Sequence, residues 1–195
     1  MLTYQCIPVG PLESNSYIAR DRATGALALI DCGVFNKRVR EAIAEAGGDL
    51  RYILLTHGHF DHVRGVPAAK AAYPGAQVCI CAEDVPLLRS EKADLLLHGG
   101  EIIPLDDSSL RVISVPGHSP GGLCFLSEKL LFTGDTLFRG EVGRADLPGG
   151  DWPTLCASIK ELYALEGDYK VLPGHGPPSS LEHERRNNPY VKMER

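Results

Sequence analysis

Short apolar runs separated by polar turns recur along the chain, and this pattern predicts β-strands. Turn-forming residues around Gly10-Pro11 and across Asp21–Gly25 separate the first of these runs. The glycine-rich stretch Leu137–Gly150 predicts a long loop. The predicted strands are Leu2–Pro8, Ser14–Arg20, Ala26–Ile30, Tyr52–Leu55, Gln77–Cys81, Leu110–Val115, Leu123–Leu126, Lys129–Thr133 and Tyr169–Leu172.

Apolar residues at helical spacing lie between several of these runs and predict helices. The first predicted helix ends at Gly47-Gly48, and the second covers Val63–Ala72. The charged stretch Glu83–Leu97 predicts a third helical segment. The buried face of the first helix is expected to hold Val39, Ala42, Ile43 and Ala46.

A helix is also predicted in the last quarter of the chain, with Asp151 as its N-cap and Pro153 in its first turn. We expect Gly167 to end this helix and a short final helix to cover Ser180–Arg186. The buried side of the helix that begins after Asp151 is expected to hold Trp152, Leu155, Ile159 and Leu162. Strands that alternate with helices, without a repeat or a linker, indicate an α/β fold in a single domain over residues 1–195.

Composition and charge narrow the classes of function. Hydrophobic residues make up 44% of the 195 residues and charged residues 23%, which is typical of a globular chain that buries a core. The formal net charge of −5 argues against nucleic acid as a main partner. There is no apolar run of about 18 residues for a membrane span, and the first residues do not resemble a secretory signal. We therefore expect neither nucleic acid nor a membrane as a partner, and the oligomeric state stays open.

Six cysteines are scattered along the chain without a C-x-x-C pair. We predict that five of them are reduced, buried thiols rather than disulfides or zinc ligands. Cys32 is left open, because it follows Asp31 at the end of a predicted strand. Reduced thiols are typical of a reducing compartment, so we expect a cytoplasmic protein.

The candidate chemistry is concentrated in the run Thr56-His57-Gly58-His59-Phe60-Asp61-His62, directly after a predicted buried strand. A single histidine there would favour a core residue with a satisfied partner. Three imidazoles and a carboxylate at this spacing favour a metal site instead, because the strand behind them can direct several ligands to one point.

Further potential ligands follow the ends of other predicted strands. His118, Asp135 and His175 each come after an apolar strand and a break of Gly, Pro or Thr residues. Strand ends on one rim of a sandwich can converge on a single pocket. The two remaining histidines, His98 and His183, are predicted to be solvated surface residues.

Five histidines and two aspartates are too many ligands for one tetrahedral or five-coordinate ion. They suit two ions that share one carboxylate, with a water or hydroxide between them. Two metals about 3.5–4 Å apart lower the pKa of a bridging water and polarise a carbonyl or phosphoryl oxygen, which is a hydrolase arrangement. Imidazole and carboxylate ligands without a thiolate fit Zn, Fe or Mn, and we expect two divalent ions with Zn ahead of the others.

Five motifs together resemble those of the metallo-β-lactamase fold superfamily, and the resemblance covers nearly the whole chain. The resemblance implies a four-layer αββα sandwich, an α/β (α+β) architecture with the metal site at one edge of two packed sheets. The motifs are Asp31-x-Gly33, Thr56-His57-x-His59-x-Asp61-His62, Pro116-Gly117-His118-Ser119-Pro120-Gly121, Gly134-Asp135-Thr136-Leu137-Phe138 and Pro173-Gly174-His175-Gly176.

The same resemblance implies a division of the ligands between two ions. The first metal would be held by His57, His59 and His118. The second would be held by Asp61, His62 and His175, with Asp135 as the bridge. Asp31 would orient the histidine loop, since outer carboxylates fix imidazole tautomers.

Within the superfamily the chain is most similar to the glyoxalase II-like hydrolases, in particular to their short single-domain bacterial branch. The segment Gly134–Asp151 and the ending Glu184–Tyr190 carry this similarity. Full glyoxalase II has an additional C-terminal helical domain that helps to bind glutathione, whereas this chain continues for only 20 residues after His175. Where that enzyme has a lysine and a tyrosine at the glutathione, this loop offers Arg144 and Asp146.

Arg144 is the candidate for binding the substrate, because a guanidinium can clamp a carboxylate. A structural salt bridge from Arg144 to Asp135 or Asp146 is the alternative that the sequence leaves open.

The resemblance predicts a binuclear metal-dependent hydrolase, namely a thioesterase of the glyoxalase II type that acts on S-acylglutathione-like thioesters. A bridging hydroxide would attack, and Asp61 would orient it. A thiolate leaves without a proton because its pKa is near ~8.5, so no separate general acid is required.

Several other functions share part of this pattern. A persulfide dioxygenase would use a single iron held by His57, His118 and Asp135. A lactone hydrolase and a non-catalytic metal-binding module are further alternatives. β-Lactam hydrolysis ranks low, because the all-His/Asp ligand set is unlike the cysteine-containing zinc sites of the commonest lactamases.

Overall fold

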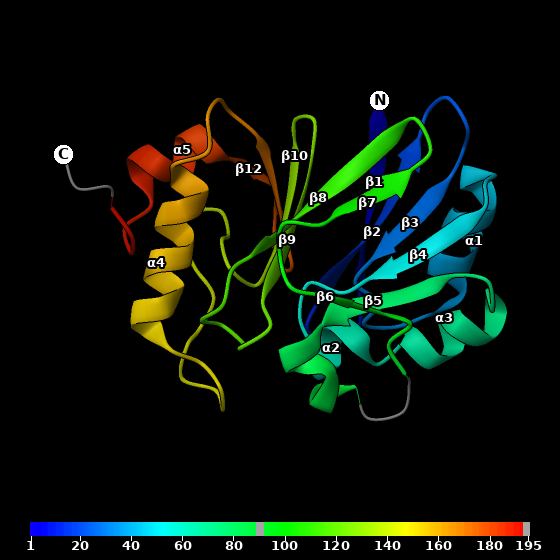
Figure 1. Cartoon of the computed structure of the whole chain (residues 1–195), viewed down its shortest axis with the longest axis horizontal. Coiled ribbons are helices and arrows are strands. Elements are labelled where there is room, and N and C mark those ends of the chain that lie inside the picture. Colours follow the sequence, from blue (N-terminus) through cyan, green and yellow to red (C-terminus); the bar gives the residue numbers. More distant parts are fainter. Residues whose placement is uncertain (89–91, 193–195) are drawn as a thin grey trace.

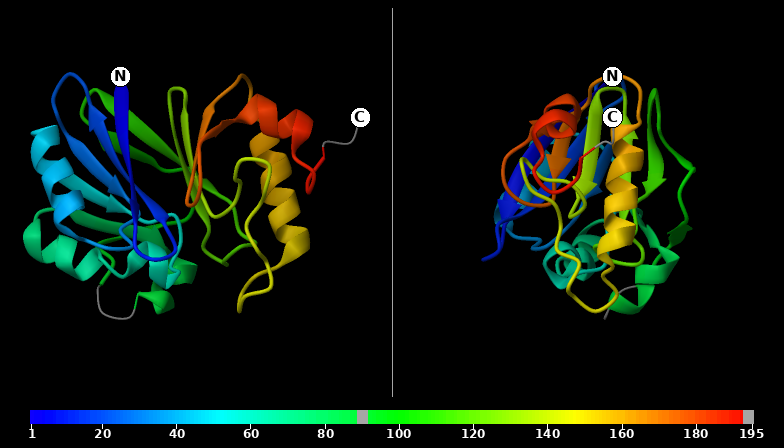
Figure 2. Two further views of the ribbon diagram at one scale, coloured as in Figure 1. Left: turned by 180° about the vertical axis from the view of Figure 1, so that it is seen from behind. Right: turned by 90° about the vertical axis from the view of Figure 1, so that its left-hand side faces the viewer.

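The computed structural model describes residues 1–88 and 92–192, in which two six-stranded sheets lie face to face (Figures 1 and 2). The first sheet has the order β1 (Leu2–Val9), β2 (Ser14–Asp21), β3 (Leu27–Ile30), β4 (Leu50–Leu54), β5 (Gln77–Cys81) and β6 (Leu95–Leu97). The second has the order β12 (Ser179–Ser180), β11 (Lys170–Pro173), β10 (Leu130–Gly134), β9 (Leu123–Ser127), β8 (Ser108–Ser114) and β7 (Ile102–Leu105).

Helices cover the outer faces of both sheets, so the predicted four-layer αββα sandwich is confirmed (Figure 1). The first sheet is covered by α1 (Lys37–Ala46) and α3 (Val66–Ala72), with the single turn α2 (Phe60–Val63) near its edge. The second sheet is covered by α4 (Trp152–Tyr163) and α5 (Leu181–Asn187). A 3-10 helix covers Ala82–Leu87. No helix in the described part of the chain is long and apolar enough to cross a membrane.

Three apolar clusters fill the three interfaces between these four layers. Successive residues of the central strands point to opposite faces, so Leu29 joins the cluster under α1 and α3 while Ile30 joins the one between the sheets. Leu131 of β10 belongs to the third cluster, with Leu155 and Ile159 of α4. Strands buried on both faces explain why the sequence shows continuous apolar runs there rather than strict alternation.

The direction of the strands places the predicted ligands at one edge. β3 and β4 are parallel neighbours, as are β10 and β11. β8 is antiparallel to β9, which is antiparallel to β10, so β8 and β10 run the same way. The carboxyl ends of these strands therefore meet where the two sheets open, and the loops after them carry the candidate ligands.

The prediction of a helix over Glu83–Leu97 is wrong. Only the 3-10 helix Ala82–Leu87 forms at its start, because Pro86 cannot donate a backbone hydrogen bond. At its end Leu95–Leu97 forms β6, an edge strand parallel to β5, and residues 89–91 lie outside the described part. The strands β7 and β12 were also not predicted.

Two other helices differ from their predictions at particular residues. The segment predicted as one helix over Val63–Ala72 splits into α2 and α3 at Gly65, where a Cβ atom would lie 2.6 Å from the backbone nitrogen of Phe35. Asp151 caps α4 as predicted and accepts a hydrogen bond from the Thr154 N–H. However, α4 ends at Tyr163 rather than near Gly167, and Trp152 is 44% exposed instead of buried.

All six cysteines are free thiols. Cys32, Cys79, Cys81 and Cys124 are buried. Cys6 is exposed and Cys156 is only partly buried, which corrects the prediction for these two residues.

Candidate metal centre

The seven predicted ligands converge from both sheets on the edge where the sheets open. His57, His59, Asp61 and His62 come from the turn after β4 and from α2. The loops after β8, β10 and β11 supply His118, Asp135 and His175. Neither sheet alone carries the full set, so the site exists only because the two sheets are packed together.

A chain of hydrogen bonds behind His57 determines which of its nitrogens faces the centre. Asp31 accepts from the backbone N–H and from the hydroxyl of Thr56, both at 2.8 Å. Because the Thr56 hydroxyl gives its proton to Asp31, it accepts from His57 Nδ1 at 3.0 Å. His57 Nε2 therefore keeps a free lone pair, and it is buried without a hydrogen-bond partner.

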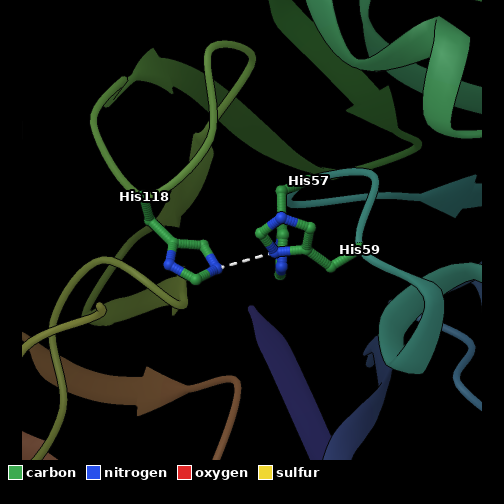
Figure 3. A group of neighbouring side chains, drawn as sticks. All are labelled: His57, His59 and His118. Atoms are coloured by element: carbon green, nitrogen blue, oxygen red, sulfur yellow. Dashed lines mark hydrogen bonds between the residues drawn. The ribbon is translucent and has the colours of Figure 1, made fainter. Parts of the chain in front are cut away.

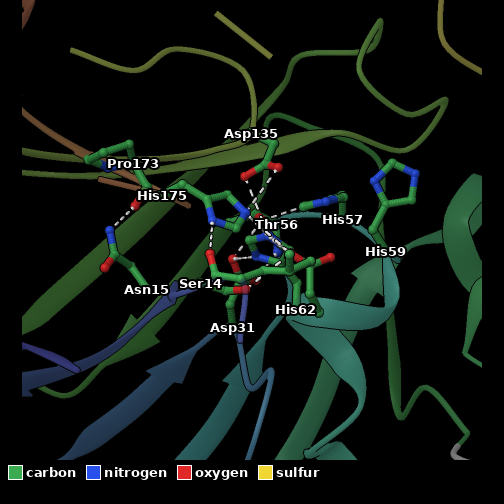
Figure 4. A network of polar contacts seen from close by, with 12 residues as sticks. Ser14, Asn15, Asp31, Thr56, His57, His59, His62, Asp135, Pro173 and His175 are labelled. Carbon is green, nitrogen blue, oxygen red and sulfur yellow. Dashed lines mark hydrogen bonds and ion pairs between the residues drawn. The ribbon is translucent and has the colours of Figure 1, made fainter. Parts of the chain in front are cut away.

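Three further histidines are oriented in the same way. Nδ1 of His62 lies 2.9 Å from Asp31 (Figure 4). Nδ1 of His118 lies 2.7 Å from the Arg144 carbonyl, and Nδ1 of His175 lies 3.0 Å from the Leu12 carbonyl. These acceptors carry no proton, so each histidine donates from Nδ1. Each therefore turns Nε2 towards the centre, and this nitrogen can bind a metal ion when it carries no proton.

The nitrogens that face the centre lie so close together that a proton or a metal ion must lie between them. His59 Nδ1 and His118 Nε2 are 2.9 Å apart, next to His57 (Figure 3). His62 Nε2 and His175 Nε2 are 3.3 Å apart. The clusters His57–His59–His118 and Asp61–His62–His175 each have ligand atoms within 4.8 Å of one another. Convergent lone pairs and the orphaned Nε2 of His57 fit divalent metal ions.

Asp135 lies between the two clusters. Its Oδ1 is 3.4 Å from His62 Nε2, and its Oδ2 is 3.5 Å from both His118 Nε2 and His175 Nε2. Oδ1 is buried without a hydrogen-bond donor. Gly174 permits this arrangement, because a Cβ at that position would come within 2.1 Å of Asp135 Oδ1. One carboxylate therefore faces both groups of imidazoles.

The two clusters differ in their electrostatics. Burial and the neighbouring histidines hold the pKa of His57 well below its usual range, and burial also lowers the pKa of His59. Burial opposes protonation of His62 as well, but Asp135 and Asp31 outweigh it and hold its pKa well above the usual range. The hydrogen bond with Asp61 raises the pKa of His175. The second cluster therefore attracts positive charge more strongly than the first.

Asp61 is ionised in this setting. Burial opposes its ionisation, but the contacts with His175 and His62 hold its pKa far below the usual range. Its Oδ2 lies 3.2 Å from His175 Nε2 and accepts a hydrogen bond from the Ser14 hydroxyl at 3.0 Å. The carboxylate thus has a fixed orientation beside the second cluster.

Asp84 is a buried residue of the site for which the sequence offered no signal. Its Oδ2 accepts from the Gly58 N–H and its Oδ1 from the Gly121 N–H, both at 2.8 Å. Gly58 lies between His57 and His59, and Gly121 closes the loop of His118. One carboxylate therefore joins the two loops that supply the first cluster. The sequence also does not indicate the roles of Ser14 and Thr56. Ser14 donates to Asp61, which is distant in sequence, and Thr56 connects Asp31 to His57.

A pocket of about 910 Å³ opens over the ligands. His59, Asp61, His118, Asp135 and His175 form its floor, and apolar and charged residues line the rest. Its wall includes Leu12, Phe60, Leu87, Phe138, Val142, Leu147 and Pro148, together with Arg139, Glu141 and Arg144.

Arg144 lies at this pocket, but its charge is already paired. Its guanidinium donates to both carboxylate oxygens of Asp146, at 2.7 Å each. The structure therefore has the salt bridge with Asp146 that the sequence left open as an alternative. His98 and His183 are exposed, as predicted.

Comparison with known proteins agrees with this geometry. The family model of the metallo-beta-lactamase superfamily matches residues 9–175. The chain belongs to this superfamily. Its members bind divalent metals, and the superfamily together with hydrolase relatives indicates a metal-dependent hydrolase that acts on small molecules.

The names of the similar proteins point to different activities within this superfamily. Hydroxyacylglutathione hydrolase GloC of Haemophilus influenzae is 33% identical over 97% of this chain and 98% of its own length. The crystal structure of the BLEG-1 B3 metallo-beta-lactamase superposes with a TM-score of 0.91 at 28% identity, covering 97% of this chain and 99% of that one. TTHA1623 in a di-iron-bound form has a TM-score of 0.84 at 35% identity, covering 96% and 100%.

Proposed function

We propose that the protein is a binuclear metal-dependent thioesterase of the glyoxalase II type, which hydrolyses S-acylglutathione-like thioesters. The position of Asp135 between the two imidazole clusters carries the proposal, since a shared carboxylate suits two ions close together. The similarity to GloC along almost the full length of both chains supports the thioester class.

The ligands would divide as the sequence motifs imply. His57, His59 and His118 would hold one ion, Asp61, His62 and His175 the other, and Asp135 would bind both. Asp31 would keep His62 and Thr56 in place through the contacts already described. Zn is our first choice, and Fe remains a candidate because the relative TTHA1623 was crystallised with two irons.

The chain's own residues would perform the remaining steps. Two bound divalent ions would supply a hydroxide at neutral pH and polarise the thioester carbonyl. Asp61, fixed by Ser14, would orient the nucleophile. The leaving thiolate needs no acid, because a thiol is ionised readily at a pKa near ~8.5. Arg144 would contact the substrate at the rim, and the reduced thiols suit a cytoplasmic enzyme.

Metal content and thioester hydrolysis measured on one sample would test this proposal. We expect about two divalent ions per chain in protein purified without added metal, and turnover that a chelator abolishes and added metal restores. Asp61→Asn should lower kcat by about 10²–10³-fold while the first ion is retained. Asp107→Asn, an exposed carboxylate in the turn between β7 and β8, is the matched control and should leave turnover unchanged.

Three results would contradict the proposal. One is full activity of Asp61→Asn. Another is a single iron per chain with oxygen uptake on glutathione persulfide. The third is hydrolysis of a cephalosporin without hydrolysis of any thioester. That result would favour a lactamase activity, in line with the similarity to the BLEG-1 B3 metallo-beta-lactamase.

A further inference from the structure

The loop after β10 begins with a tight hairpin that points into the mouth of the metal pocket. Leu137 and Val142 form a β-bridge, and the Phe138 N–H donates to the Glu141 carbonyl at 3.0 Å. Arg139 and Gly140 form the tip, where Gly140 has a φ of +70°. This hairpin therefore presents an arginine side chain at the rim of the pocket.

Helix α5 holds the hairpin in place. Glu184 is fully buried, and its carboxylate accepts from the Gly140 N–H at 2.9 Å and from the Asn188 side chain at 3.0 Å. Asn188 also donates to the Glu141 carbonyl at 3.2 Å. The backbone on the C-terminal side of Arg139 is thus fixed by two side chains, so the position of this arginine is part of the fold.

The Arg139 side chain lines two adjoining pockets. One is the pocket over the ligands, and the other has a volume of about 310 Å³ and is lined by Pro178, Ser179, Ser180 and His183 besides Arg139. This second pocket offers hydroxyl and imidazole groups but no carboxylate among its described lining. Arg139 is the residue that the linings of the two pockets have in common.

Of the two arginines that line the pocket over the ligands, one is paired with a carboxylate and the other is not. Arg144 is neutralised by Asp146 through two hydrogen bonds. Arg139 makes no hydrogen bond or ion pair with any residue in the described ranges 1–88 and 92–192. In a chain with a net charge of −5, this unpaired guanidinium is the cation best placed to attract an anionic substrate.

We propose that Arg139 binds a carboxylate or phosphate of the substrate where the two pockets meet, so that the substrate class is an anionic thioester. This rests on the proposed thioesterase function. A guanidinium binds either anion through paired N–H donors. The carboxylate of Glu141, which is exposed in the lining of the pocket over the ligands, repels the anion and so lowers its affinity for the site.

The test uses three acetyl thioesters that differ only in the thiol. N-Acetylcysteamine is uncharged, glutathione carries carboxylates and coenzyme A carries phosphates. For the anionic thioester that the enzyme prefers, Arg139→Gln should raise KM about tenfold and leave kcat nearly unchanged. The KM for the uncharged thioester should stay the same, and Arg139→Lys should retain part of the affinity.

Two variants serve as internal comparisons. Glu141→Gln should lower KM for the same anionic substrate by about two- to threefold, which is opposite in sign to the effect of Arg139→Gln. Arg38→Gln, an exposed arginine of α1 away from the pocket, should change nothing. The effect of Arg139→Gln should also shrink as the ionic strength rises. Which thiol responds identifies carboxylate or phosphate as the bound group.

A binding measurement with ligands that cannot be hydrolysed tests the anion site independently of the thioesterase activity. S-Methylglutathione and S-methyl-coenzyme A are titrated calorimetrically into the metal-loaded protein. Weaker binding of one of them to Arg139→Gln supports the anion site even if no thioester is hydrolysed. Equal KM and equal binding for wild type and Arg139→Gln would overturn the inference, as would an equal rise in KM for the uncharged thioester.

Discussion

At the scale of single residues, Asp84 joins two loops of the candidate metal centre without being one of its candidate ligands. Each of its carboxylate oxygens accepts one backbone N–H, from Gly58 and from Gly121. Both glycines approach it so closely that a Cβ on Gly121 would lie 2.8 Å from the Asp84 carboxylate carbon. A residue that joins two ligand loops should affect the metal affinity of both loops together.

We predict that Asp84→Asn weakens binding of the first metal ion by about 10–100-fold, the range typical of residues that support metal ligands. An amide has only one oxygen, so one of the two N–H groups would lose its acceptor. Competition with a chromophoric chelator measures the affinity, and circular dichroism verifies that the variant is folded. Glu83→Gln, its exposed neighbour, is the control. Equal affinities for Asp84→Asn and wild type would show that the two loops do not depend on this clamp.

At the scale of elements, α5 has more influence than its seven residues suggest. Arg185 donates to the Tyr163 carbonyl at 2.6 Å, to the Gly167 carbonyl at 2.7 Å and also to the Leu165 carbonyl, so it secures the turn after α4. Glu184 secures the hairpin that carries Arg139. These contacts give the Glu184–Tyr190 motif a structural role, because they tie the hairpin of Arg139 and the turn after α4 to α5.

We predict that Glu184→Gln lowers the free energy of unfolding by about 1–3 kcal/mol, because a neutral amide oxygen is a weaker acceptor than the buried carboxylate for the Gly140 N–H and the Asn188 side chain. The midpoint of urea unfolding measures the loss. Glu182→Gln on the exposed side of α5 removes only a surface ion pair with Arg186 and should cost less than about 1 kcal/mol. If both variants unfolded at the same urea concentration, the clamp on the hairpin would contribute nothing to stability.

At the scale of the whole molecule, the site joins two halves of the fold. The first sheet carries the His57–His62 run, and the loops of the second sheet carry His118, Asp135 and His175. In the absence of cations, convergent lone pairs and carboxylates at this junction repel one another. Metal binding should therefore stabilise the packing of one sheet on the other.

We predict that removing the metals lowers the free energy of unfolding by about 2.7 kcal/mol or more when free metal stands at about a hundred times its dissociation constant. Calorimetry with and without a chelator measures the shift of the unfolding midpoint. His57→Ala should reduce this shift, whereas His98→Ala, an exposed histidine, should leave it intact. An unchanged midpoint after complete metal removal would mean that the ions do not couple the sheets.

Much of the fold could be predicted from the sequence because its signals are local. Apolar runs identified most strands, and the predicted Asp151 cap lies where α4 begins. The predictions of helices and strands failed where contacts between residues distant in sequence decide the structure. Leu95–Leu97 becomes a strand only because β5 offers it a free edge, and the helical pattern breaks at Gly65 because its N–H donates to the Cys32 carbonyl instead of to the preceding turn.

The sequence by itself determined the ligand types and their attachment to strand ends, because motifs such as His57–His62 are short and their chemistry is carried by residue type. Only the tertiary structure decided which atoms meet. Two sheets had to pack before Asp135 could face both clusters and before Asp84 could join two loops. Distances between side chains that are far apart in the chain follow from packing, which no local pattern encodes.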